Sequence, residues 1–194
     1  MKHFAALPYR EIATFMTELR RQAGVSARAL ELAILTAARS GEVLNATWRE
    51  VDLEQKLWTI PAQRTKALKE HRIPLSDPAI AILREMEAIR QNDFVFPGRR
   101  GPLSAVALQS ALKRMGYDVT VHGFRSSFRD WAGNETNFPR ELAEHALAHV
   151  IGDKAEQAYR RSDALARRRE LTDAWARHCE GAGAENVLAF KRPV

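Results

Sequence analysis

Residues 121–131 of the chain read Val-His-Gly-Phe-Arg-Ser-Ser-Phe-Arg-Asp-Trp. The aromatic residues of this stretch recur at helical spacing, so they share one face of a helix: Phe124, Phe128 and Trp131. His122 and Arg125 are three residues apart at the start of the same helix and therefore point to one side of it. The stretch predicts a core helix with a proton carrier and an anion-binding group at one end.

Helical spacing of apolar residues continues on both sides of this stretch. Helices are expected to begin near Pro8, Ser26, Asp77, Ser104, Pro139 and Asp163. The first should end at Gly24, the second near residues 39–41 and the third at Asn92, with a short helix over 42–44. The helix from Pro139 is expected to carry both His145 and His149.

Two short runs with strand character, 57–60 and 72–75, flank the polar stretch 63–71. They predict a small antiparallel sheet with a basic hairpin. The fold class is therefore expected to be mainly α with one small antiparallel β-sheet (α+β). A chain of 194 residues with no repeat or linker should form one domain.

The amino-acid composition excludes some classes of protein and favours others. No apolar run approaches the roughly 18 residues that cross a bilayer, and the single Cys179 cannot form an internal disulfide, so a reducing cytoplasm is expected. The formal charge of +6 suits a polyanionic partner. Basic residues cluster at 99–100, 160–161 and 167–169, as a surface that binds phosphates requires. A solvated helix face explains each cluster equally well when it is taken alone.

Three further blocks lie in order around the His-x-x-Arg stretch. Arg39 follows a hydrophobic helix in the sequence Arg-Ser-Gly-Glu and needs a partner if it is buried. Leu-Ala-His ends at His149, and Tyr159 follows ten residues later. Lys66 lies in the polar hairpin. In this order the blocks resemble those of tyrosine site-specific recombinases of the phage integrase family, over roughly residues 7–181.

The resemblance implies a catalytic domain of the integrase fold with six functional residues: Arg39, Lys66, His122, Arg125, His149 and Tyr159. Two departures stand out. Ala148 occupies the place of the usual Gly before the histidine, and Lys69 competes with Lys66 for the hairpin role.

The chemistry of these residue types agrees with the resemblance. Attack on a phosphodiester builds negative charge on two nonbridging oxygens, and Arg39 and Arg125 can each donate two charge-assisted hydrogen bonds to them. A tyrosine with an ordinary pKa near 10 needs a proton acceptor, for which His122 is the candidate. Lys66 is the candidate general acid for the leaving 5′ oxygen. His149 would donate to a nonbridging oxygen.

Other interpretations stay open. His145 and His149, if spaced one helical turn apart, resemble a zinc pair, which would make the protein a metal-dependent hydrolase. A DNA-binding module with an inactive site is the other rival. Tyr9 and Tyr117 are interpreted as packing residues.

The resemblance also implies a reaction and partners. Cleavage would leave a 3′-phosphotyrosyl link and a free 5′ hydroxyl, with no cofactor and no metal. The partner is double-stranded DNA. The protein would be a homotetramer on DNA during strand exchange and a monomer when it is free. Residues 1–181 would be the catalytic domain and residues 182–194 a tail exchanged between protomers. No core-binding domain precedes Leu7, so we expect a catalytic domain that lacks it, located in the cytoplasm at the nucleoid.

Overall fold

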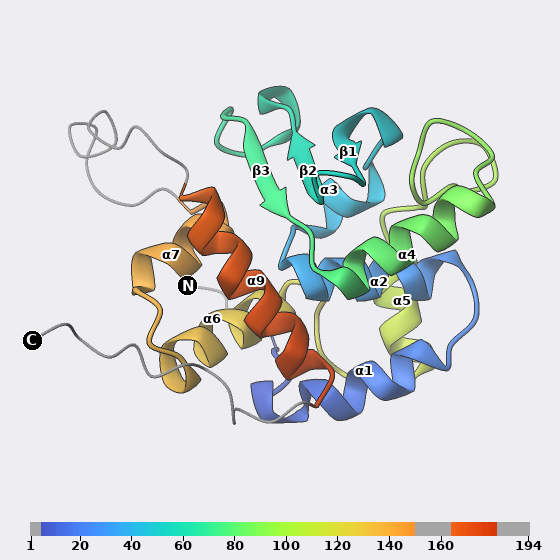
Figure 1. Ribbon diagram of the computed structural model, residues 1–194. Helices are drawn as coiled ribbons and strands as arrows, with labels where there is room; N and C mark the ends of the chain where they lie inside the picture. Colours follow the sequence, from blue (N-terminus) through green and yellow to red (C-terminus); the bar gives the residue numbers. More distant parts are fainter. Residues whose placement is uncertain (1–4, 150–163, 182–194) are drawn as a thin grey trace, which may run out of the picture.

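A buried helix, α2 (Val25–Thr36), lies at the centre of the fold in the computed structural model, which describes residues 5–149 and 164–181 (Figure 1). Most of α2 is buried around its whole circumference, as expected for a helix enclosed by others. Five of the described helices pack against it: α1 (Ile12–Arg20), α3 (Ser40–Leu44), α4 (Asp77–Ala88), α5 (Ala107–Arg114) and α9 (Leu165–Cys179). The core is therefore organised by a helix that has almost no solvent face.

A three-stranded antiparallel sheet lies at one end of the helices (Figure 1). Its strands are β1 (Val51–Asp52), β2 (Leu57–Ile60) and β3 (His71–Pro74), in that order across the sheet. Trp58 pairs with Ile73 and Ile60 with His71, and all four side chains are buried. The expected mainly helical fold with a small antiparallel sheet is confirmed. Strand β1 was not predicted, because two residues are too short to show alternation.

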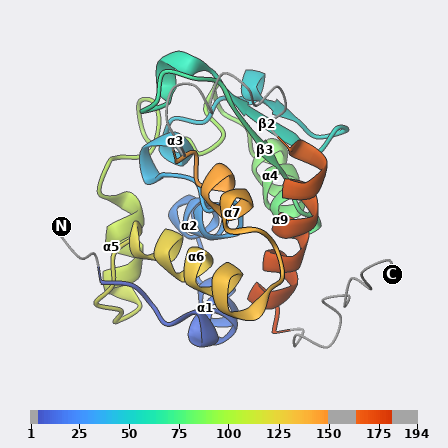
Figure 2. The same cartoon turned by 90° about the vertical axis from the view of Figure 1, so that its left-hand side faces the viewer.

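Helices α6 (Gly123–Glu135), α7 (Arg140–Ala146) and α9 form one side of the molecule (Figures 1 and 2). The predicted aromatic face of α6 is buried and meets α9, where the Trp131 and Trp175 ring centroids lie 5.0 Å apart. The indole of Trp175 donates a 2.8 Å hydrogen bond to the carbonyl of Ile34 in α2. Aromatic packing and one buried hydrogen bond thus tie α6 and α9 to the central helix.

Several helix ends differ from the sequence expectation. Helix α1 ends at Arg20, and Gly24, whose φ is 98°, precedes α2 in place of the expected Ser26 cap. Helix α2 ends at Thr36 because Ala37 adopts a left-handed conformation. Helix α4 ends four residues before Asn92, and α5 begins at Ala107 rather than Ser104. Such ends depend on backbone conformation, which apolar spacing does not report.

The remaining short elements connect the helices and strands. The predicted helix at 42–44 is α3 (Ser40–Leu44), and three turns are 3-10 helices: Tyr9–Glu11, Trp48–Glu50 and Ala62–Arg64. In residues 5–149 and 164–181, no helix combines the length and the apolar character that crossing a membrane requires.

Candidate active site

Arg125 lies in the first turn of α6 with its side chain buried. Its guanidinium donates to the carbonyl of Ala37, directly after α2, and at 2.7 Å to the carbonyl of Leu147, directly after α7. Burial lowers the pKa of Arg125 to about 10, and the nearby positive charge of Arg39 acts in the same direction. The group therefore remains a cation at neutral pH, held in one orientation by two backbone carbonyls.

Arg39 is the residue before α3, and the Glu42 side chain in the first turn of α3 holds it. The Glu42 carboxylate accepts from the Arg39 backbone N–H and from its guanidinium, both at 2.9 Å. The other guanidinium nitrogen lies 3.4 Å from the carbonyl oxygen of Leu147 and 3.3 Å from that of Ala148. The sequence predicted that Arg39 needs a partner if it is buried; the structure leaves it partly exposed and gives it Glu42 as a partner.

The two arginines thus converge on one backbone carbonyl, that of Leu147, although they lie in different thirds of the sequence. Two guanidinium groups that share one acceptor lie close enough to share an anion with two oxygens. The carboxylates of Glu42 and Glu144 act on Arg125 from the same region and offset part of the charge. The arrangement is suited to binding a phosphate.

His122 lies immediately before α6 and is exposed. Partial burial lowers the pKa of His122, and the charges of Arg125, Arg39, His149 and Lys66 lower it further. A histidine with a pKa below 6.5 is neutral at pH 7, so it can accept a proton.

Position 123, between His122 and the aromatic face of α6, has room only for glycine. A Cβ at this position would collide with the carbonyl oxygen of Ala5. The Thr120 N–H donates to that same carbonyl at 2.9 Å, and Ser127 donates to the carbonyl of Leu7. The N-terminal segment therefore crosses the start of α6 in direct contact with its backbone and fixes the helix end that carries His122.

His149 does not lie on α7, contrary to the sequence expectation, because that helix ends at Ala146. Ala148 has a φ of 50°, which turns the chain so that the His149 N–H donates to the carbonyl of Glu144 at 2.9 Å. Ring atom Nδ1 lies 2.5 Å from a carboxylate oxygen of Glu144, and Nε2 lies 3.4 Å from a guanidinium nitrogen of Arg125. The turn therefore directs the imidazole toward the arginines.

This turn also corrects the zinc interpretation. His145 and His149 do not share one helical face, because His149 follows the end of α7. Within the part of the chain that the structure describes, no group of three or more histidine, cysteine or acidic side chains is placed to hold a metal ion.

Lys66 lies on the exposed hairpin between β2 and β3. The hydroxyl oxygen of the buried Thr65 lies 2.7 Å from the carbonyl oxygen of Lys69 and 3.1 Å from that of Ala62, so its single proton can be donated to either, and it accepts from the Lys69 N–H at 3.1 Å. This small network shapes the loop from which the lysine extends. The charge of Lys66 is among those that lower the pKa of His122.

Tyr159, the sixth predicted residue, lies outside the described residues, as do Arg160–Arg161 and the tail 182–194. The other two tyrosines are held by glutamates. The Tyr9 hydroxyl donates to Glu135 and the Tyr117 hydroxyl to Glu18, each at 2.8 Å. Both side chains are also partly buried against the core, which agrees with their interpretation as packing residues.

Comparison with known proteins identifies the family of the chain. Residues 6–165 match the model of the phage integrase family. The chain belongs to the phage integrase family. It is 37% identical over 161 residues to the prophage integrase IntA of Escherichia coli K12, a match that covers 80% of this chain and 39% of IntA. It is 33% identical over 184 residues to the integrase of Shigella phage Sf6, covering 90% of this chain and 48% of that protein.

Solved structures share the fold of this family member. The integrase of mycobacterium phage Brujita matches with a TM-score of 0.67 at 18% identity, over 89% of this chain and 57% of that one. A lambda integrase dimer bound to a COC′ core site matches with a TM-score of 0.59 at 21% identity, over 79% and 62% of the two chains. The chain thus spans about half of the length of the relatives that it matches, or less.

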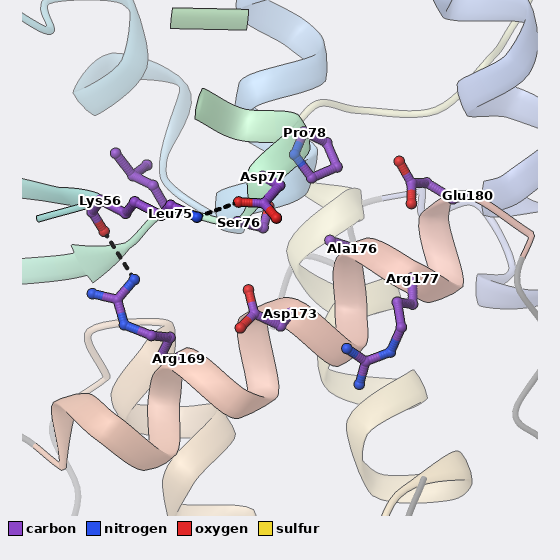
Figure 3. A pocket seen from close by; sticks show the side chains of 10 residues that line it. All are labelled: Lys56, Leu75, Ser76, Asp77, Pro78, Arg169, Asp173, Ala176, Arg177 and Glu180. Carbon is purple, nitrogen blue, oxygen red and sulfur yellow. Dashed lines mark hydrogen bonds and ion pairs between the residues drawn. The ribbon is translucent and has the colours of Figure 1, made fainter. Parts of the chain in front are cut away.

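A separate hollow of about 310 Å³ lies between the start of α4 and helix α9 of the integrase fold (Figure 3). Lys56 and Asp77 form an ion pair of 2.5 Å in its wall, and Arg169 donates to the carbonyls of Gln55 and Lys56. Burial raises the pKa of Asp173 in its wall. The bonds from Arg169 tie α9 to the turn that precedes β2, in the sheet whose hairpin carries Lys66. We therefore interpret the hollow as part of the structural contact between α9 and the sheet.

Three residues near the arginines were not assigned a role from the sequence: Glu42, Glu144 and His71. His71 is buried beneath the site and forms a hydrogen bond to the backbone of Ala146. Alternation with the buried Ile73 along β3 is the signal that predicts an inward-facing His71. Glu42 falls at the third position of α3, where a capping carboxylate is common. Nothing in the sequence around Glu144 indicates its contact with His149.

Proposed function

We propose that this chain catalyses site-specific recombination, by cutting DNA and rejoining it through a 3′-phosphotyrosyl intermediate on Tyr159. The convergence of Arg39 and Arg125 on the carbonyl of Leu147 carries the proposal, because it pairs two fixed cations beside two histidines. Membership of the phage integrase family supports it. The lambda integrase dimer bound to a core site, which shares the fold, supports double-stranded DNA as the partner.

In the proposed reaction the arginines bind the nonbridging oxygens of the scissile phosphate. Charge on these oxygens grows as Tyr159 attacks, so both cations stabilise the transition state more than the ground state. Neutral His122 accepts the proton of the tyrosine hydroxyl, and His149 donates to a nonbridging oxygen. The phosphotyrosyl bond forms as the bond to the 5′ oxygen breaks.

Lys66 completes the step by giving a proton to the departing 5′ oxygen. Its place on an exposed hairpin suits this task, because the lysine must reach an oxygen on the far side of the phosphorus from the tyrosine. The energy of the broken ester is kept in the phosphotyrosyl bond, so religation is the reverse reaction. The chemistry needs no nucleotide, and the cations of the protein supply the positive charge.

The same proposal includes the assembly and the place of action. We infer a homotetramer on DNA during strand exchange and a monomer when free, acting in the cytoplasm at the nucleoid. Residues 1–181 would act as the catalytic domain, and the tail 182–194 would dock on a neighbouring protomer. The four-protomer state follows from the symmetry of exchanging strands between two duplexes.

The test is covalent trapping on a nicked suicide duplex made from the flanking genomic sequence. We expect the wild-type chain to give an adduct that survives a denaturing gel and maps to Tyr159 by mass spectrometry, and Tyr159→Phe to give none. Tyr117→Phe is the matched control, because it removes the same oxygen at a cost of about 1 kcal/mol of stability and should leave the adduct intact. An adduct in Tyr159→Phe, or one that maps elsewhere, would contradict the proposal.

A further inference from the structure

Glu144 contacts His149 at the ring nitrogen that faces away from the arginines. Its carboxylate oxygen lies 2.5 Å from Nδ1, and only 14% of the Glu144 side chain is exposed. Its second oxygen lies 4.0 Å from Nε of Arg140, a side chain that is 85% exposed. Exposed ion pairs contribute little to the stability of a fold, so the short contact with His149 is the stronger interaction of this carboxylate.

The opposite ring nitrogen, Nε2, lies 3.4 Å from the guanidinium nitrogen of Arg125 that also binds the Leu147 carbonyl. A guanidinium can only donate, and an ionised carboxylate can only accept. The neutral ring that satisfies both contacts therefore carries its proton on Nδ1 and a lone pair on Nε2. The two neighbours of His149 thus select one tautomer and one ring orientation.

We propose that Glu144 is a positioning residue for His149: it holds the proton on Nδ1 and keeps Nε2 directed at the phosphate site. This inference rests on the proposed function. When a phosphate oxygen takes the place of the Arg125 contact, Nε2 can donate only if the ring is protonated on both nitrogens. The Glu144 carboxylate stabilises that cation against the neighbouring charges of Arg125 and Arg39.

The backbone of the turn supports the same role. The His149 N–H donates to the carbonyl of Glu144 at 2.9 Å, so Glu144 binds His149 through both its backbone and its side chain. The left-handed Ala148 is the residue that makes both contacts possible at once. Replacement of the carboxylate alone leaves this backbone bond in place, so Glu144→Gln tests the ring contact separately from the turn.

The first measurement is the tautomer of His149 in the DNA-free protein, read from two-bond ¹H–¹⁵N correlations of the labelled imidazole at pH 7.5. We expect the Nδ1-protonated form in the wild type and a substantial population of the Nε2-protonated form in Glu144→Gln. Glu141→Gln is the matched control, because Glu141 is exposed on the same helix. An unchanged tautomer in Glu144→Gln would overturn the inference.

The second measurement is the single-turnover rate of suicide-substrate cleavage. We expect Glu144→Gln to slow it about ten- to hundredfold, the range typical when the partner that orients a functional histidine is lost. Glu144→Gln combined with His149→Gln should be no slower than His149→Gln alone. Additive losses would show that Glu144 acts by another route and would overturn the positioning role.

The two measurements also separate the inference from the function on which it rests. If the wild-type chain cleaves no DNA, the proposed function fails while the tautomer measurement still decides whether Glu144 sets the ring. A second variant, Glu144→Asp, keeps the charge and shortens the side chain by one methylene. It should retain more of the wild-type tautomer than Glu144→Gln, and an equal loss in both would contradict the electrostatic part of the inference.

Discussion

His71 should make the folded chain sensitive to mild acid. Its ring is buried in β3, and burial, assisted by the charges of Arg168 and Arg39, lowers its pKa from 6.5 to about 4. The hydrogen bond to Ala146 and the charge of Glu42 oppose this shift and are outweighed. In the unfolded chain the same histidine takes up a proton near pH 6.5.

Proton linkage gives the direction in which the stability of the fold changes with pH. Between pH 6.5 and about 4 the unfolded chain binds the proton and the folded chain does not, so falling pH favours unfolding. The contribution of His71 is fully present above pH 6.5 and is lost progressively toward pH 4. The difference of about 2.5 in pKa corresponds to about 3 kcal/mol, at ~1.4 kcal/mol for each pH unit. That is a large share of the roughly 5–15 kcal/mol that stabilises a typical domain.

The assay is urea denaturation at a series of pH values between 7.5 and 4.5, for the wild type and for His71→Gln. The glutamine does not titrate and still carries an N–H for the Ala146 backbone. Acidic groups elsewhere titrate in both proteins, so the difference between the two curves isolates His71. We expect the wild type to lose about 2.5 kcal/mol more than the variant as the pH falls through this window, which ends just above the folded pKa.

Parallel curves for the two proteins would refute the reasoning. If His71→Gln is too unstable to measure at pH 7.5, the protonation of His71 in the wild type can be followed directly by NMR. A midpoint near 6.5 would then show that burial does not disfavour the charged ring.

Three further outcomes are expected. Lys66→Ala should slow cleavage of normal DNA, and its cleavage rate should recover when the leaving 5′ oxygen is replaced by sulfur, because a thiolate departs without a proton. If Lys69→Ala shows this recovery and Lys66→Ala does not, Lys69 is the general acid. Ala148→Gly should raise the free energy of unfolding by up to about 1 kcal/mol, since glycine adopts a φ of 50° without strain, and a lower urea midpoint would argue against this. Cleavage should continue in EDTA, whereas activity that is abolished by EDTA and restored by zinc or magnesium would show that a metal is required.

The sequence by itself determined the helical class, the core face of α6 and the presence of a sheet. These features are local: apolar spacing reports which face of a helix or strand is buried, and the buried Phe124, Phe128 and Trp131 agree with it. The sequence also indicated that Arg39 needs a partner, although it did not identify Glu42, three residues further along, as that partner. The order of the motif blocks was sufficient to indicate the family that the comparison confirmed.

The tertiary structure decided how the site is assembled. Arg39 and Arg125 meet at the carbonyl of Leu147, and every residue type has such a carbonyl, so no side-chain pattern marks this one. His149 lies outside the helix that the sequence predicted, because Ala148 takes a left-handed conformation that helical periodicity does not reveal. His71 is influenced by charges from α3 and α9, which approach it only in the folded chain. Backbone acceptors, left-handed turns and long-range charges are products of packing, and for that reason they required the structure.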